Sequence, residues 1–156
     1  MKIVDILDPM MIIPELVARD KVGLIQEMAS YIIQKIPERI GCTRDDIEEA
    51  LLGRERLGST GVGESVAIPH AKLSGLKTLT ACFGRSLTGV PFDAIDEKPV
   101  RLVFVLLVPE NSAGVHLKAL ARIARLLKNS SFRDRLLMLP DQKTLYEAFI
   151  EEDAKY

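Results

Sequence analysis

The chain contains two histidines, and both lie where an imidazole could reach a ligand. His70 follows Pro69 at the end of a short apolar stretch, and His116 lies where a glycine-containing turn leads into a helical pattern. Strand ends and helix starts are common positions for ligand sites in α/β proteins. An imidazole there can act as a nucleophile or a charge switch near neutral pH. Taken singly, each histidine is better explained as an ordinary surface or core imidazole.

A loop of small residues precedes His70. Successive backbone N–H groups in such a loop can form a concave site for an anion. The loop lacks the Gly-Lys-Ser/Thr of a P-loop and the strand-to-helix context of a dinucleotide fingerprint. Turn chemistry alone favours a plain connection, so the loop becomes a phosphate site only in combination with its neighbours. The phosphate-binding candidates in it are Gly58, Ser59, Thr60, Gly61 and Gly63.

Arg54 lies just before this loop. It follows Ile47 by seven residues on a predicted helix, so it continues the apolar face of that helix, whereas Glu55 and Arg56 are expected to face solvent. Its guanidinium could bind an anion, or it could simply complement the negative end of the helix dipole. Two imidazoles, an arginine and a row of N–H groups together suit a phosphoryl group carried on a histidine, because that transfer needs positioning and charge stabilisation.

Metal and cofactor sites are not predicted, because no carboxylate or thiolate lies at a fitting spacing beside the histidines. The chain has 156 residues and a net charge of −1 with both histidines neutral, which predicts one domain over residues 1–156. The near-zero charge argues against nucleic acid and anionic membranes as partners. No apolar run reaches the roughly 18–20 residues of a membrane span. With two cysteines at no metal-type spacing, we expect a cytoplasmic protein without direct membrane insertion.

Hydrophobic periodicity predicts the elements of the first half. A helical turn and an extended edge piece are expected within residues 1–15. Asp20 caps a helix that stops at Pro37. Thr43, in a capping-box pattern, opens a second helix that ends near Glu55. The small residues that follow are expected to form a loop.

Extended segments and then helices fill the second half. Residues 66–68 form a short strand before a proline, and residues 79–85 and 86–90 form two more. Residues 100–108 are almost wholly apolar, which is typical of a central strand covered on both faces. Three helices close the chain: one that carries Leu117 to Leu127, one over about residues 132–139 and one after Asp141. The pattern predicts an α/β fold with a mixed sheet and helices on both faces.

The run of residues 54–72, with Ala-Ile-Pro-His at its centre, resembles the active-site signature of the phosphotransferase-system enzyme IIA domains of the fructose/mannitol family. Residues 92–100 are similar to the nitrogen-regulatory branch of that family. Leu106 to Pro109 and the His116-Leu117 pair also resemble it, so the similarity extends over nearly the whole chain. It implies that His70 is phosphorylated, at Nε2, and that Arg54 and His116 are the supporting pair. It also implies the mixed sheet between helices.

The resemblance implies partners as well. The donor is a small phosphocarrier, HPr or its nitrogen-branch relative, which docks over His70 mainly through apolar contacts. The acceptor is a regulatory target or an enzyme IIB. Val62, Leu73 and exposed residues near His116 are candidates for the docking face. A basic stripe on the helix after His116 is interpreted as a solvated face without an assigned partner; it consists of Lys118, Arg122 and Arg125.

One departure from the family pattern concerns the loop, where Glu64 and Ser65 replace the usual Asn-Gly after Gly63. Glu64 either brings a negative charge near the phosphate or points to solvent. Three functions stay open: a regulatory phosphohistidine relay, a sugar-transport subunit that passes phosphate to an enzyme IIB, and a protein-binding module whose histidine is not phosphorylated. The conjunction of the two histidines with the arginine argues against the third, and residues 92–100 favour the first.

Overall fold

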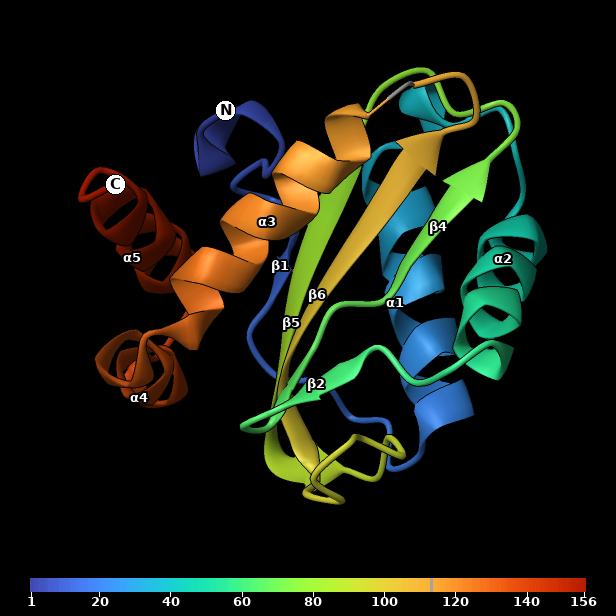
Figure 1. Cartoon of the computed structure of the whole chain (residues 1–156). Coiled ribbons are helices and arrows are strands. Elements are labelled where there is room, and N and C mark those ends of the chain that lie inside the picture. The colour runs from blue at the N-terminus through green and yellow to red at the C-terminus, as the bar shows by residue number, and fades with distance from the viewer. Residues whose placement is uncertain (113) are drawn as a thin grey trace.

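The computed structural model describes residues 1–112 and 114–156. A mixed six-stranded sheet lies between two groups of helices: α1 and α2 cover one face, and α3, α4 and α5 lie on the other (Figure 1). This confirms the predicted fold class. The strands are β1 (Ile12–Ile13), β2 (Gly61–Gly63), β3 (Val66–Ala67), β4 (His70–Leu73), β5 (Thr80–Val90) and β6 (Val100–Pro109). The helices are α1 (Lys21–Lys35), α2 (Arg44–Arg56), α3 (Val115–Lys128), α4 (Ser130–Met138) and α5 (Gln142–Asp153), with short 3-10 turns at Ile3–Asp5 and Pro37–Arg39.

Strand β6 is the centre of the sheet. The strand order is β1-β5-β6-β3-β2, and β4 also pairs with β6. Its apolar residues are buried, as expected for a strand covered on both faces. Strand β5 runs antiparallel to it, whereas β3 and β4 run parallel to it along one edge, with Ala67 opposite Val103 and His70 opposite Leu106. Strand β4 therefore continues the line of β3 and begins with His70.

The predicted starts of the first two helices are confirmed. The Asp20 carboxylate accepts the Gly23 N–H at 2.7 Å and opens α1. At the start of α2, Thr43 and Asp46 cap each other's backbone N–H groups. Helix α2 packs against both α1 and β4, so its C-terminal turn is held beside the start of β4.

Three local predictions were wrong. Gly61–Gly63 is not loop but strand β2, which pairs antiparallel with β3. Residues 79–90, predicted as two strands, form the single strand β5, whose register shifts between Arg85 and Val90. His70 begins a strand rather than ending one, because the Pro69 carbonyl accepts the Leu106 N–H at 2.9 Å and the chain continues along β6.

The basic stripe on α3 is only partly solvated, contrary to the prediction. Arg122 forms an ion pair with the buried carboxylate of Asp153, and Arg125 lies over the Tyr156 ring at 4.4 Å from its centroid. Lys118 is exposed. Across the described parts of the chain, no helix has the length and apolar character that a membrane crossing requires.

Candidate functional site

One pocket of about 400 Å³ contains the three side chains that the sequence assigned to phosphoryl transfer. His70 comes from β4, Arg54 from the last turn of α2 and His116 from the first turn of α3. The pairing of β4 with β6, and the packing of α2 on β4, bring these distant segments together. The other residues that line the pocket are Ala50, Gly53, Leu57, Ala71, Lys72, Val108, Leu117 and Leu120. No carboxylate is among the described lining residues.

A single hydrogen bond sets the tautomer of His70. Its Nδ1 lies 2.8 Å from the carbonyl oxygen of Ile68. A carbonyl only accepts hydrogen bonds, so Nδ1 carries the hydrogen. In the neutral ring, Nε2 is then the nitrogen with the free electron pair. The ring is half-buried, so this nucleophilic nitrogen belongs to a partly sheltered site that a partner can still reach.

His116 has a buried ring nitrogen without a hydrogen-bond partner among the described residues. It lies in the first turn of α3, after Gly114, whose φ of 75° places it in the left-handed region. The Nδ1 atom of His116 is buried and has no hydrogen-bond partner within the described residues. Buried polar atoms are nearly always paired, so an unpaired one in a pocket fits a partner that a ligand brings. The start of a helix also favours an anion.

The Arg54 side chain is half-buried at the same pocket. Its Nη1 donates a hydrogen bond to the Gly58 carbonyl at 2.8 Å, which fixes one part of the guanidinium. The same contact places a donor near the C-terminal end of α2, which fits the structural role considered for this arginine.

The predicted phosphate-binding loop lies outside the pocket that contains His70. The Thr60 N–H donates to the Glu55 carboxylate at 3.0 Å, the Gly61 N–H to Ser59 Oγ at 3.1 Å, and the Gly58 N–H to the Glu55 carbonyl at 3.1 Å. These N–H groups are occupied inside the loop. The pocket of His70 is lined by none of the five phosphate-binding candidates, which are Gly58, Ser59, Thr60, Gly61 and Gly63.

Glu55 explains this placement and was wrongly expected to face solvent. Its side chain is buried, and its carboxylate also accepts the Thr60 hydroxyl and lies 2.8 Å from Lys21 Nζ. The sequence did carry a signal. Ile47, Leu51 and Glu55 follow one another at a spacing of four residues, which places them on one buried face of α2.

The apolar docking candidates divide into exposed and buried residues. Val62, on β2, is 58% exposed, and Leu57 and Leu117 at the mouth of the His70 pocket are 85% and 62% exposed. Leu73 is 5% exposed, so it cannot contact a partner. The prediction for Leu73 was wrong because alternate residues of β4 point to opposite faces, and Leu73 points into the core.

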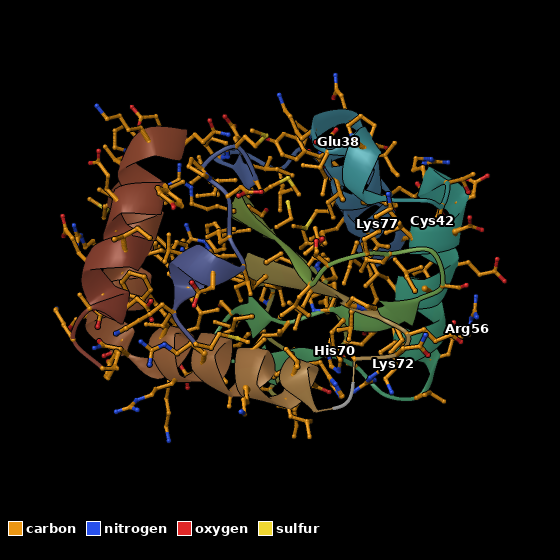
Figure 2. All side chains as sticks on the ribbon, turned by 90° about the horizontal axis from the view of Figure 1, so that it is seen from above. Glu38, Cys42, Arg56, His70, Lys72 and Lys77 are labelled. Atoms are coloured by element: carbon orange, nitrogen blue, oxygen red, sulfur yellow. The ribbon has the colours of Figure 1, made fainter. Side chains whose placement is uncertain are left out.

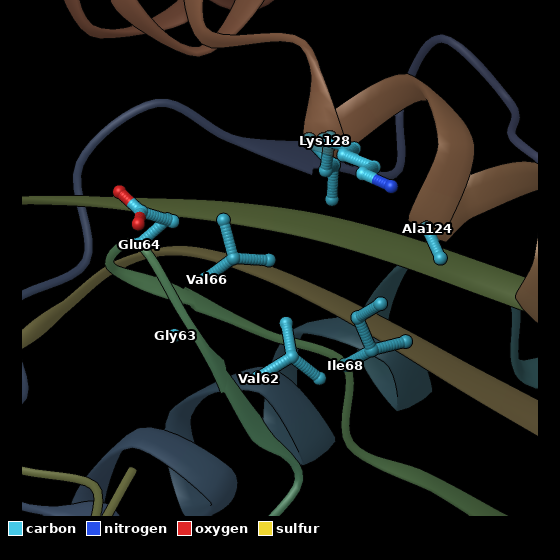
Figure 3. Close-up of a pocket in the computed structure, with 8 residues that line it drawn as sticks. Val62, Gly63, Glu64, Val66, Ile68, Ala124 and Lys128 are labelled. Carbon is cyan, nitrogen blue, oxygen red and sulfur yellow. The ribbon is translucent and has the colours of Figure 1, made fainter. Parts of the chain in front are cut away.

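A second, apolar groove of about 290 Å³ separates the β2–β3 hairpin from α3 (Figure 3). Val62, Val66 and Ile68 line one side and Ala124 and Leu127 the other. Glu64 also lines this groove, and not the pocket of His70.

The hairpin turn is held by contacts on two sides. The Glu64 N–H donates to the Asp96 carboxylate at 2.9 Å, and its own carboxylate lies 3.7 Å from Arg133 Nη2. Hydrogen bonds from the backbone N–H groups of Glu64 and Lys98 keep the pKa of the Asp96 carboxyl below its usual range. The negative charge of Glu64 therefore has a cation partner away from the His70 pocket.

Comparisons with known proteins show the family of this chain. A family model described as "Phosphoenolpyruvate-dependent sugar phosphotransferase system, EIIA 2" matches residues 5–152. A nitrogen regulatory protein of Bradyrhizobium diazoefficiens is 41% identical over 146 residues, which cover 94% of this chain and 93% of that protein. The fructose-specific EIIABC component of Bacillus subtilis is 32% identical over 155 residues, covering 98% of this chain and 24% of that longer protein.

The same branch is found among solved structures. The crystal structure of the nitrogen regulatory protein IIA-Ntr from Neisseria meningitidis superposes with a TM-score of 0.86 at 36% identity, covering 94% of this chain and 98% of that one. The chain therefore belongs to the EIIA 2 family of the phosphoenolpyruvate-dependent sugar phosphotransferase system.

Proposed function

We propose that the protein carries a phosphoryl group on Nε2 of His70 and uses it mainly for regulation. The observation that carries this proposal is the hydrogen bond from Nδ1 of His70 to the Ile68 carbonyl, which leaves Nε2 as the nucleophile in a pocket shared with Arg54 and His116. The match of residues 5–152 to a phosphotransferase-system family supports this proposal. We further propose that residues 1–156 act as one such domain in the cytoplasm.

The phosphorylated donor and this protein together supply every atom that the transfer needs. The Nε2 electron pair of His70 forms the new N–P bond while the N–P bond of the donor's phosphohistidine breaks, and that electron pair returns to the donor's ring. The proton stays on Nδ1 of His70 throughout, in its hydrogen bond to the Ile68 carbonyl. Charge on the equatorial phosphoryl oxygens is stabilised by the Arg54 guanidinium and by a hydrogen bond from His116.

The donor is an HPr-type phosphocarrier or its nitrogen-branch relative. Leu57 and Leu117 give it an exposed apolar surface at the pocket, and Val62 is a further exposed apolar residue on β2. A phosphohistidine adds about two negative charges, by analogy with other phosphorylated side chains. On an apolar surface this charge penalises some partners by desolvation and like-charge repulsion. Target proteins can therefore distinguish the two states without a change of fold.

The first experiment tests the phosphorylation site. The purified protein is incubated with a phosphorylated HPr-type carrier, and acid-labile, base-stable phosphate is measured. His70→Ala should take no label, while His116→Ala keeps some. Arg54→Ala and His116→Ala should each slow single-turnover transfer by about 10²–10³-fold, the typical loss for one donor to a developing anion.

Label on His70→Ala at the wild-type level would contradict the assignment. Transfer at the wild-type rate in both supporting variants would contradict their roles. A wild-type protein that takes no label from any HPr-type carrier would favour the third candidate, a protein-binding module of the same fold.

The similarity to the fructose-specific EIIABC component supports one alternative, a transport subunit that passes phosphate to an enzyme IIB. The nitrogen regulatory relatives favour regulation. Pull-down with phosphorylated, unphosphorylated and His70→Ala protein, beside a sugar-phosphorylation assay with membranes, separates the two. Partners that depend on the state of His70 support regulation. An identical partner set together with strong sugar phosphorylation supports transport.

A further inference from the structure

We propose that Lys72 is a second cation of the phosphoryl site, and that its ammonium group binds an oxygen of the phosphoryl group on His70. This inference rests on the proposed function and adds a catalytic residue to it. Arg54 then approaches the phosphoryl group from α2 and Lys72 approaches it from β4.

The strand places Lys72 on the same face as the nucleophile. Both residues belong to β4, and successive side chains of a strand alternate between its faces, so His70 and Lys72 point the same way. At about 3.3 Å per residue their Cα atoms lie about 6.6 Å apart, a span that the four-carbon stem of a lysine can cover. Both residues line the pocket of Arg54 and His116, and Figure 2 shows them close to one another.

The Lys72 ammonium group is free to bind. Within the parts of the chain that the structure describes, it makes no hydrogen bond and no ion pair, unlike Lys21 and Lys155, which pair with buried carboxylates. Its partner across the sheet is Val108, an apolar residue that offers it no charge. Its side chain is exposed, so binding an oxygen does not require it to leave another partner.

The charges of the pocket favour this role. A phosphohistidine carries about two negative charges. Arg54 and Lys72 are the only residues of fixed charge among the described lining residues, and both are cations. Arg54 already gives one of its N–H groups to the Gly58 carbonyl. Two cations on different elements can therefore neutralise the phosphoryl group and bind different equatorial oxygens. One arginine alone would neutralise only about half of its negative charge.

The test compares Lys72→Met and Lys72→Arg with Lys77→Met as a matched control. Lys77 is also an exposed lysine, but it lies outside the pocket and well apart from His70 (Figure 2). Single-turnover transfer from a phosphorylated HPr-type carrier is followed over a range of donor concentrations. The equilibrium ratio of phosphorylated protein to phosphorylated donor is measured in the same reactions.

Lys72→Met should lower the maximal transfer rate by about tenfold to a hundredfold, as expected for the loss of one hydrogen bond to a charged group. It should also shift the equilibrium toward the phosphorylated donor, because the ammonium group stabilises the product. Lys72→Arg should restore most of both quantities, and Lys77→Met should change neither.

Two results would overturn the proposal. One is wild-type rate and equilibrium in Lys72→Met. The other is a rise in the donor concentration needed for half-maximal rate with the equilibrium unchanged, which would make Lys72 a docking residue. Both are distinct from failure of the proposed function, in which the wild-type protein itself takes no label on His70.

Discussion

For His70, the Ile68 carbonyl fixes which ring nitrogen carries the hydrogen. With Nδ1 held at 2.8 Å from that oxygen, only Nε2 has an electron pair to offer. The departures at Glu64 and Ser65 lie in the hairpin turn between β2 and β3, and Glu64 lines the apolar groove rather than the His70 pocket. Both residues hold a left-handed backbone conformation, with φ of 55° and 62°, which side chains with a Cβ rarely adopt.

Ser65→Gly should stabilise the protein. The left-handed conformation costs a residue with a Cβ about 1–2 kcal/mol, and glycine adopts it freely at some entropic cost in the unfolded chain. We expect the free energy of unfolding to rise by about 1 kcal/mol in urea denaturation. Ser74→Gly is the control, because Ser74 does not have a positive φ and the change there should lower stability slightly. A loss of stability in Ser65→Gly would show that the turn carries no such strain.

At the scale of elements, a buried ion pair joins α1 to α2 and to the segment that follows α2. Lys21 Nζ lies 2.8 Å from the Glu55 carboxylate and 4.8 Å from the centroid of the Phe92 ring. Glu55 in turn holds Thr60. The segment after α2 includes Gly58, whose carbonyl accepts the hydrogen bond from Arg54, so the pair also helps to place the guanidinium in the pocket.

Lys21→Met should therefore weaken both stability and transfer. Removal of one partner leaves a buried carboxylate without its cation, which costs about 3–5 kcal/mol for fully buried pairs. Because the Lys21 side chain is 19% exposed, we expect a smaller loss of about 2 kcal/mol in urea denaturation. Transfer to His70 should slow as Arg54 is displaced. The control is Arg44→Met, which removes the ion pairs of a more exposed cation with Asp45 and Glu48 and should cost at most about 1 kcal/mol. Equal losses in the two variants would contradict a special role for the buried pair.

Local rules predicted most elements of the fold but not all of the site. Apolar periodicity and side-chain caps located the helices, and the apolar run of residues 100–108 located the central strand. Strand β2 was missed because two of its three residues are glycine, which has little intrinsic preference for strands, and its pairing with β3 is a tertiary effect. Arg54, His70 and His116 were singled out by type and spacing.

Burial of polar side chains was the main source of error. Arg122 and Glu55 were expected on solvated faces because charged residues usually lie there. Arg122 pairs with Asp153, and Glu55 pairs with Lys21. Both partners lie far away in the sequence and on another helix, so the local residue pattern does not indicate them. Lys72 was not singled out, since a lysine beside a histidine gains meaning only from the pocket that the strand forms with α2 and α3.

At the scale of the whole molecule, one carboxylate connects the two ends of the described chain. Asp153 accepts the Ile3 N–H at 2.6 Å and forms an ion pair with Arg122. Lys2 Nζ donates to the Tyr156 carbonyl at 2.9 Å. The first turn of the protein, α3 and α5 are therefore held together by one buried charge cluster on the face of the sheet opposite α1 and α2 (Figure 1).

Arg122→Met should destabilise the protein without impairing transfer. It leaves Asp153 buried with its backbone partner alone, so we expect a loss of about 3 kcal/mol in urea denaturation. Single-turnover labelling of His70 under folding conditions should stay at the wild-type rate, because Arg122 lies outside the pocket. Arg125→Met is the control: it removes only the contact with the Tyr156 ring, worth about 0.5–1 kcal/mol at an exposed site. Slow labelling in folded Arg122→Met would show that the cluster acts on the site.

The central position of β6 has a consequence for the order in which the molecule can form. Without β6, the described sheet separates into the pairs β1–β5 and β2–β3 and the lone strand β4, which begins with His70. A chain growing from its N-terminus cannot assemble the sheet until Pro109 has been made. His116 follows only after that, in α3. Because the parallel pairings that complete the site also close long loops, they are slow steps in folding. The proposed nucleophile, His70, is therefore synthesised well before its pocket is complete, and we expect phosphotransfer competence to arise late, with the docking of α3.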